Sequence, residues 1–297
     1  MNNQIKRINF NHSFIFFLFC NIISLITFIK TNYTISPLIC LLLILSIGVS
    51  HGSLDNIKGK KLFEMLKINN FFIFYLSYIL LAILIIIFWL IFPSASLTFF
   101  LLVASYHFGK EDTFFLINNV SLYNSLLFFL KGSLIILAPM YFHFDETINI
   151  FKFLLVDNET FYNFLNFVES NQILLSGIIL STLSSILLFA RNFELRKFII
   201  FLDYFSILII NYYFSPLIAF TLYFCFLHSI RHSITLIFEL NRENLKLGLN
   251  IFIKKALPLT ALTASFCFVS LYFLNNTYDF DSSILKIIFI GLASLTF

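Results

Sequence analysis

Long apolar runs separated by short polar segments dominate this chain. A helix needs about 20 apolar residues to cross the hydrocarbon core of a bilayer, and runs of this kind indicate transmembrane spans. The predicted spans cover residues 13–30, 35–51, 70–92, 95–117, 122–142, 171–190, 197–212, 214–238, 254–274 and 284–297. We therefore expect an all-α fold, a polytopic integral membrane helical bundle of about ten transmembrane spans.

The composition excludes an ordinary soluble protein. Hydrophobic residues make up 60% of the chain and charged residues only 11%. No polar region is long enough for a separate soluble domain, so we predict a single transmembrane domain over 1–297. The net charge of +4 is concentrated in a few loops, which indicates membrane topology rather than binding to nucleic acid.

Positive charge alternates between successive loops. The loops rich in Lys and Arg lie near residues 6–7, 58–67, 110, 191–197 and 242–255, and the loops between them are poor in both. By the positive-inside rule, the basic loops face the cytoplasm. We therefore expect a multi-pass protein of the cell membrane with both termini cytoplasmic.

Two segments depart from the regular pattern of spans. Residues 143–170 mix aromatic and polar residues, which favours an amphipathic segment at the membrane interface. A helix over 284–297 would rise only about 21 Å, less than the hydrocarbon core of roughly 30 Å. This last span is either re-entrant or the sequence is clipped at its C-terminus, and we expect the clipped chain.

Four histidines in apolar segments are the strongest chemical signal. His51 ends one predicted span, His107 lies in another, and His228 and His232 share a third. The i, i+4 spacing of the last two puts both imidazoles on one helix face, and the predicted topology puts all four at similar depth. Imidazole in a membrane is costly without a partner. The four either bind one transition metal, which imidazole suits, or form hydrogen bonds between helices.

Charged residues near these histidines are candidates for holding the rings in place. Asp55 follows His51 by four residues, and Asp112 follows His107 by five, next to Glu111. A metal-bound histidine usually donates its second N–H to a carboxylate or carbonyl, but these acids are also typical of a solvated helix end. Lys131, near the middle of a predicted span, is harder to explain as a structural residue.

Three histidine motifs resemble those of one enzyme family. His-Gly-Ser-Leu-Asp at 51–55, Ser-Tyr-His-Phe-Gly-Lys-Glu-Asp at 105–112 and His-Ser-Ile-Arg-His at 228–232 are similar to motifs of the Brp/Blh family of membrane β-carotene 15,15′-dioxygenases. Lys-Gly-Ser-Leu-Ile-Ile-Leu-Ala-Pro at 131–139 also resembles a segment of that family. The motifs occur in family order from about residue 45 onwards.

The resemblance implies Fe(2+), dioxygen and oxidative cleavage of the central double bond of β-carotene to two retinals. It implies that the iron ligands and catalytic residues are His51, His107, His228 and His232, with retinal passing to a microbial rhodopsin. Members usually continue into Pro-His after a Leu-Thr-x run, and this chain ends at Leu295-Thr296-Phe297.

Aromatic residues near the histidines either line a tunnel for this apolar polyene or are ordinary packing. They are Tyr106, Phe108, Tyr223, Phe224 and Phe226. Two other functions were weighed against carotenoid cleavage. A transporter of metal ions or small solutes would use the histidines as a pathway, but no internal repeat is evident. A membrane diiron desaturase or hydroxylase needs about eight histidines, and the chain has six, with His12 and His143 poorly placed.

Overall fold

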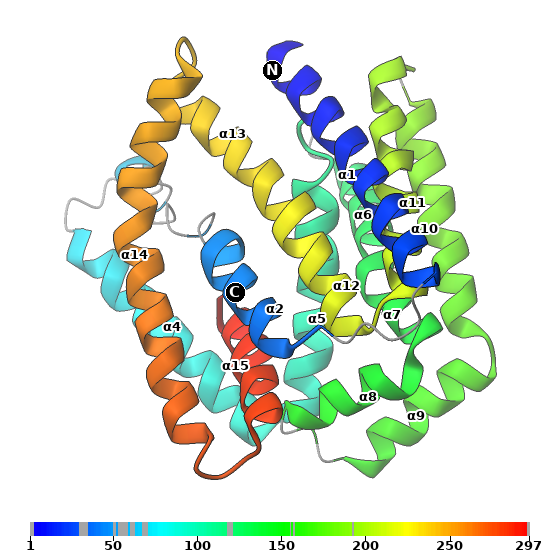
Figure 1. Cartoon of the computed structure of the whole chain (residues 1–297), viewed down its shortest axis with the longest axis vertical. Coiled ribbons are helices and arrows are strands. Elements are labelled where there is room, and N and C mark those ends of the chain that lie inside the picture. The colour runs from blue at the N-terminus through cyan, green and yellow to red at the C-terminus, as the bar shows by residue number, and fades with distance from the viewer. Residues whose placement is uncertain are drawn as a thin grey trace.

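Helices are the only regular secondary structure in the part of the chain that the structure describes (Figure 1). The computed structural model describes residues 3–29, 35–49, 52, 59, 63–66, 71–117, 121–154, 156, 158–191 and 193–295. This confirms the predicted all-α fold class. His51 and Asp55 lie outside the described residues.

Each predicted span overlaps one helix or two or three consecutive helical elements. These elements are α1 (Asn3–Ile29), α2 (Pro37–Leu43) with the π-helical turn η1 (Ile44–Gly48), α4 (Phe71–Ile91), α5 (Pro93–Glu111), α6 (Leu122–Gly132) with α7 (Leu134–Phe142), α10 (Ile173–Ala190), η3 (Leu195–Phe198) with α11 (Ile199–Tyr213), α12 (Pro216–Leu222) with the π-helical turn η4 (Tyr223–Ser229) and α13 (Ile230–Leu240), α14 (Leu245–Leu274) and α15 (Phe280–Leu295). Six of these segments, among the described residues, are long and apolar enough to cross a membrane. The count of ten spans stays a prediction.

The helix starts follow from local sequence. Pro37, Pro93 and Pro216 each open a helix, where the missing N–H of proline costs nothing and its fixed φ suits the first turn. Ser121 and Asn244 cap α6 and α14 by accepting hydrogen bonds from backbone N–H groups of the first turn. These residues start a new helix within a few residues of the end of the preceding one, as successive spans require.

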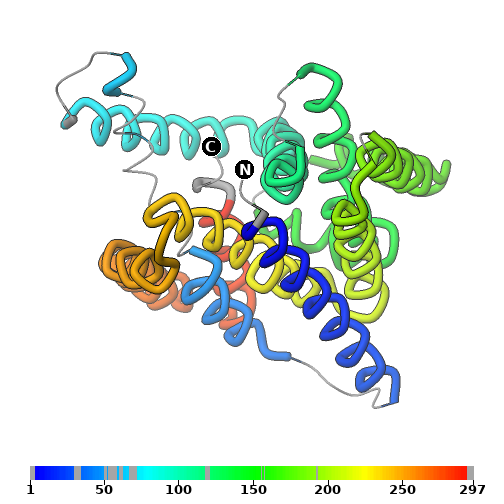
Figure 2. Tube along the Cα trace, turned by 90° about the horizontal axis from the view of Figure 1, so that it is seen from above, coloured from blue at the N-terminus to red at the C-terminus, as the bar shows by residue number. Residues whose placement is uncertain are grey.

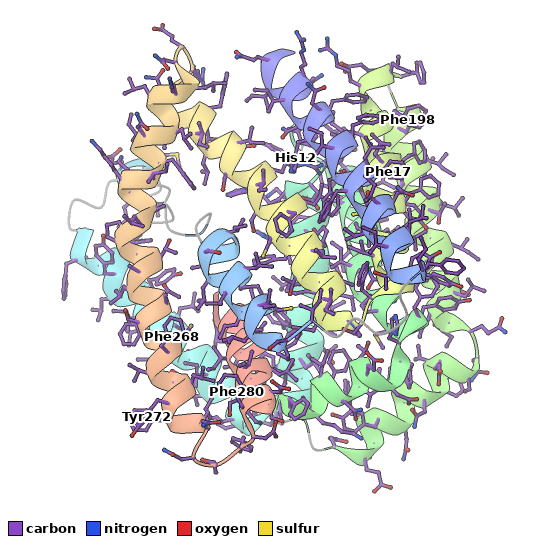
Figure 3. All side chains as sticks on the ribbon, in the orientation of Figure 1. His12, Phe17, Phe198, Phe268, Tyr272 and Phe280 are labelled. Carbon is purple, nitrogen blue, oxygen red and sulfur yellow. The ribbon has the colours of Figure 1, made fainter. Side chains whose placement is uncertain are left out.

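The outer helices expose apolar side chains. Leu84 on α4 is 62% exposed, and Phe266 and Tyr272 on α14 are 65% and 72% exposed. Figure 3 shows Phe268 and Tyr272 on the outer side of α14, and Figure 2 shows α14 at the periphery of the bundle. Such a surface would be unstable in water and is suited to contact with lipid.

Loops predicted on the same side of the membrane lie at the same end of the bundle. The N-terminus and the turn between α13 and α14 are at the top of Figure 1. Lys6 also forms an ion pair of 2.9 Å with Glu194, just before η3. At the opposite end lie the turn between α14 and α15 and two helices from the predicted amphipathic segment, α8 (Phe144–Phe153) and α9 (Glu159–Ser170). Which end faces the cytoplasm stays a prediction.

A pair of glycines lets α5 and α6 approach closely. A Cβ added at Gly109 would collide with the backbone carbonyl oxygen of Phe128, and one added at Gly132 would collide with that of Ser105. Gly109 lies inside α5 and therefore serves the helix crossing, not the end of a helix. The close approach brings the C-terminal end of α5 next to Lys131.

We expect Gly109→Ala to lower the free energy of unfolding by about 1–3 kcal/mol, because the added methyl forces two backbones apart. Gly291→Ala is the matched control, since a Cβ there meets no atom within 4 Å and alanine favours helix. Chemical unfolding of the purified protein in detergent micelles measures both. Equal stability of the two variants would contradict the role of the crossing.

Candidate metal site and its buried charge network

Three of the four predicted histidines lie together. His228 in η4 and His232 in α13 stack with ring centroids 6.5 Å apart and planes 12° apart. His107 from α5 places its ring centroid 5.4 Å from that of His228. His228 is only 1% exposed. The position of the fourth predicted histidine, His51, lies outside the described residues.

Two π-helical turns form one wall of this site. The turn η1 packs against η4. The Ser229 hydroxyl donates a hydrogen bond of 3.4 Å to the carbonyl oxygen of Gly48. A side chain at Gly48 would meet the ring of Phe224, which itself stacks on His228 with ring centroids 5.9 Å apart. π-Helical turns are frequent at functional sites, and here both lie within a few residues of a predicted ligand.

Each histidine of the i, i+4 pair is held by a carboxylate from the end of α5. Nδ1 of His228 lies 3.1 Å from Oδ1 of Asp112, and Nδ1 of His232 lies 3.0 Å from Oε2 of Glu111. The sequence suggested that Asp112 holds His107, and that pairing is wrong. At i+5 the side chain of Asp112 points about 140° away from that of His107 around the helix, so it reaches the neighbouring helix instead.

Asp112 connects the histidines to a buried ion pair. Its second carboxylate oxygen accepts a hydrogen bond of 2.7 Å from the Tyr223 hydroxyl, and its backbone carbonyl accepts one of 3.1 Å from Arg231. Arg231 also binds both carboxylate oxygens of Asp203 at 2.7 and 2.9 Å and the Ser13 hydroxyl at 2.5 Å. Helices α1, α5, α11 and α13 are thereby joined in one network.

The network balances its charges internally. Asp112, Lys131, Asp203 and Arg231 are all at most 6% exposed, so two anions face two cations. Lys131 interacts electrostatically with the other three, and no described contact joins it to a histidine. Isolated charges in this environment would be very costly, whereas a paired set is tolerated. We therefore assign Lys131 to charge balance.

His12 belongs to the same region, although its sequence context gave no sign of this. It lies on α1, and its Nε2 is 2.8 Å from the backbone carbonyl oxygen of Phe226 in η4. It also interacts electrostatically with Arg231, Asp203 and Asp112. The sequence signal that could have found it is the helical spacing of the polar residues Asn9 and Ser13 in an apolar segment. The structure buries both, so this face of α1 is turned inward.

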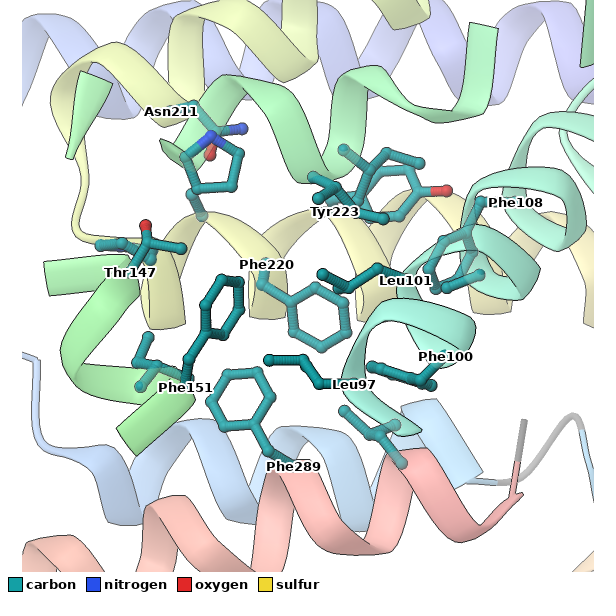
Figure 4. A pocket seen from close by; sticks show the side chains of 18 of the residues that line it. Leu97, Phe100, Leu101, Phe108, Thr147, Phe151, Asn211, Phe220, Tyr223 and Phe289 are labelled. Carbon is teal, nitrogen blue, oxygen red and sulfur yellow. The ribbon is translucent and has the colours of Figure 1, made fainter. Parts of the chain in front are cut away.

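An apolar cavity begins beside the histidines. Its walls are almost entirely apolar, and Phe108 and Tyr223 line the end nearest the site. The ring of Phe108 is 4.8 Å from that of His228, in an edge-to-face arrangement. Figure 4 shows Leu97, Leu101, Phe220 and Phe289 along its length. Tyr106, Phe224 and Phe226, also considered as lining, are not among its walls.

The donors present suit a transition metal. Two imidazoles bound to one ion, with bonds of about 2.1 Å, have ring centroids roughly 4.5–6.5 Å apart. The distance of 5.4 Å between His107 and His228 falls within that range, and that of 6.5 Å between His228 and His232 reaches its upper limit. The carboxylates hold the Nδ1 atoms of His228 and His232, as metal sites require of the second ring nitrogen. In the described part of the chain, no three His, Cys, Asp or Glu side chains already form a complete binding group. The chemistry of these donors therefore fits a transition metal. Which residues bind the metal stays a prediction.

We expect Asp203→Asn to lower the free energy of unfolding by about 3–5 kcal/mol, because it removes the bidentate partner of a buried guanidinium. The matched change Glu194→Gln breaks the partly exposed pair with Lys6 and should cost less than about 1 kcal/mol. Chemical unfolding in detergent micelles compares the two. A small effect of Asp203→Asn would show that the network is not what holds these helices together.

Comparison with known proteins identifies the family. A profile of the family described as beta-carotene 15,15'-dioxygenase matches residues 42–297. A beta-carotene 15,15'-dioxygenase from uncultured marine bacterium 66A03 is 26% identical over 262 residues, which cover 86% of this chain and 88% of the relative. No solved structure matches. With its histidine motifs inside the matched region, the chain belongs to the beta-carotene 15,15'-dioxygenase family of carotenoid dioxygenases.

Proposed function

We propose that this protein cleaves the central double bond of β-carotene with dioxygen to give two molecules of retinal. Each carbon of the broken double bond gains one oxygen atom, so the reaction is balanced without another reductant or oxidant. The observation that carries the proposal is the cluster of His107, His228 and His232 at the end of an apolar cavity. Family membership supports this activity over the transporter and diiron alternatives.

We further propose that Fe(2+) is the cofactor, bound by His51, His107, His228 and His232. Three of these side chains lie together, and Gly48, three residues before His51, packs against η4. Bound iron would supply a centre that binds and activates dioxygen. A ligand set made only of imidazole nitrogen suits iron.

The residues around the histidines would orient them and keep the site dry. Asp112 and Glu111 fix the orientation of His228 and His232 through their Nδ1 atoms and increase the donor strength of the rings. Phe108 and Phe224 cover the ring of His228. Since β-carotene has no polar group, binding would rest on apolar burial and shape, and water excluded by these aromatic rings could not compete in the site.

An apolar substrate and product fit a protein of the cell membrane. The proposed arrangement has ten spans and both termini in the cytoplasm, with the lipid bilayer as the source of β-carotene. Exposed apolar faces on α4 and α14 support contact with lipid. Retinal released into the bilayer would reach an acceptor such as a microbial rhodopsin by lateral diffusion.

Expression in a bacterium that makes β-carotene tests the function. We expect the cells to lose their orange colour and to accumulate retinal, because both substrates are then present. His228→Ala and His232→Ala should abolish retinal formation and lower the iron content of the purified protein together. Either variant with full activity and normal iron would disprove its place in the ligand set, and wild-type cells that stay orange would disprove the function.

The carboxylate of Glu111 offers a milder test of the iron site. Glu111→Gln keeps the shape of the side chain but removes the charge that holds His232, and we expect iron affinity to fall by about 10–100-fold while the protein stays folded. Glu243→Gln, an exposed position at the turn before α14, is the control. Iron titration of the metal-free protein measures both, and identical affinities would rule out the role given to Glu111.

A further inference from the structure

Helix α1 contacts the segment that carries two of the proposed iron ligands. It packs against both η4 and α13. Nε2 of His12 lies 2.8 Å from the carbonyl oxygen of Phe226, two residues before His228. The next residue, Ser13, accepts a hydrogen bond from Arg231 with its hydroxyl. The helix α1 therefore holds this segment at two points, one on each side of His228.

The hydrogen bond from His12 reaches a backbone carbonyl that the π-helical turn deprives of its usual donor. In a regular α-helix the carbonyl of Phe226 would accept the N–H of Ile230, four residues later. Here the N–H of Ile230 donates to the carbonyl of Leu227 instead. Because a carbonyl oxygen accepts and does not donate, Nε2 of His12 carries the proton. His12 thus supplies a donor at the point where the regular backbone pattern is interrupted.

The position of the extra residue in η4 decides the orientation of His228. A π-helical turn holds one residue more than an α-helical turn. If this extra residue moves along the helix, each residue that it passes turns by about 100° around the axis. A shift past His228 would turn its ring away from His107 and from Asp112, which it contacts now. The hydrogen bond at Phe226 opposes the shift, because the carbonyl would move away from its donor.

His12 acts from outside the proposed site. It is not among the residues that line the cavity. It belongs to a helix that precedes residues 42–297, the region that the family profile matches. Family membership therefore does not imply this contact, and an effect of His12 on bound iron would have to pass through η4.

We propose that His12 is a positioning residue for His228. Its Nε2–H fixes the place of the π-helical turn η4, and Ser13 supports the same segment through Arg231. The assignment rests on the proposed function for the identity of the metal. The hydrogen bond at Phe226 then increases iron affinity and turnover but leaves the binding of β-carotene unchanged.

Two substitutions of similar length separate the hydrogen bond of His12 from its volume. His12→Gln keeps an N–H donor at the end of the side chain, whereas His12→Met lacks one. We expect His12→Met to weaken Fe(2+) binding about tenfold through loss of the hydrogen bond, and to lower kcat with an unchanged KM for β-carotene. His12→Gln should restore both quantities to near the wild-type values. Titration of the metal-free full-length protein with Fe(2+) and assays of retinal formation, both in detergent micelles, measure these effects.

Amide hydrogen exchange in the metal-free protein tests the position of η4 without iron or activity. Residues 223–231 should exchange about tenfold faster in His12→Met and at the wild-type rate in His12→Gln, because local opening is easier without the hydrogen bond. Ser24→Ala is the control, since Ser24 is a buried residue of α1 about three turns beyond His12. It should change neither the exchange nor the iron affinity.

The two measurements distinguish failure of this proposal from failure of the proposed function. Unchanged exchange in His12→Met, equal effects of His12→Met and His12→Gln, or faster exchange in a protein that keeps its full iron affinity would overturn the proposal. If the wild type binds no iron and forms no retinal, the proposed function fails, while faster exchange in His12→Met that His12→Gln restores still supports the role of His12 in fixing η4. Ser13→Ala serves if His12→Met does not fold: faster exchange over residues 223–231 supports the proposal, and unchanged exchange contradicts it.

Discussion

The carboxylate of Asp112 is the point on which the interior of this protein depends. It contacts a histidine, a tyrosine hydroxyl and, through its own backbone, the guanidinium of Arg231. Because this guanidinium also binds Asp203 and Ser13, the position of His228 is tied to α1 and α11. Burial of these charges without such partners would be costly. The same atoms therefore pair the buried charges and fix the position of His228, the proposed metal ligand.

Close helix packing makes this arrangement possible. Gly109 and Gly132 lack the side chains that would otherwise separate α5 from α6. Asp112 lies three residues after Gly109, and Lys131 directly precedes Gly132. Small residues at helix crossings are a general feature of membrane bundles. Here the crossing also decides which ionisable groups become neighbours, so backbone packing determines the electrostatics of the site.

Sequence reasoning succeeded where periodicity along a single helix was enough. The apolar runs predicted the helices, and the i, i+4 spacing placed His228 and His232 on one face, as their stacked rings confirm. Sequence reasoning failed where a side chain contacts a residue on another helix. Asp112 was assigned to its sequence neighbour His107 but binds His228, and His12 was dismissed although it contacts η4. Separation along the chain determines which face of its own helix a residue occupies, but which helix lies opposite depends on packing that no local pattern encodes.

The π-helical turn η4 permits a change of length inside this helix. A π-helical turn contains one residue more than the α-helical turn it replaces, so the extra residue is taken up within the turn. Deletion of one residue between Tyr223 and Ser229 would restore a regular α-helix, while the residues after the turn would keep their orientation. Arg231 would still face Asp203, and His232 would still face Glu111. Lineages that keep this buried ion pair can therefore shorten the segment by one residue, although they lose one of the side chains that η4 presents.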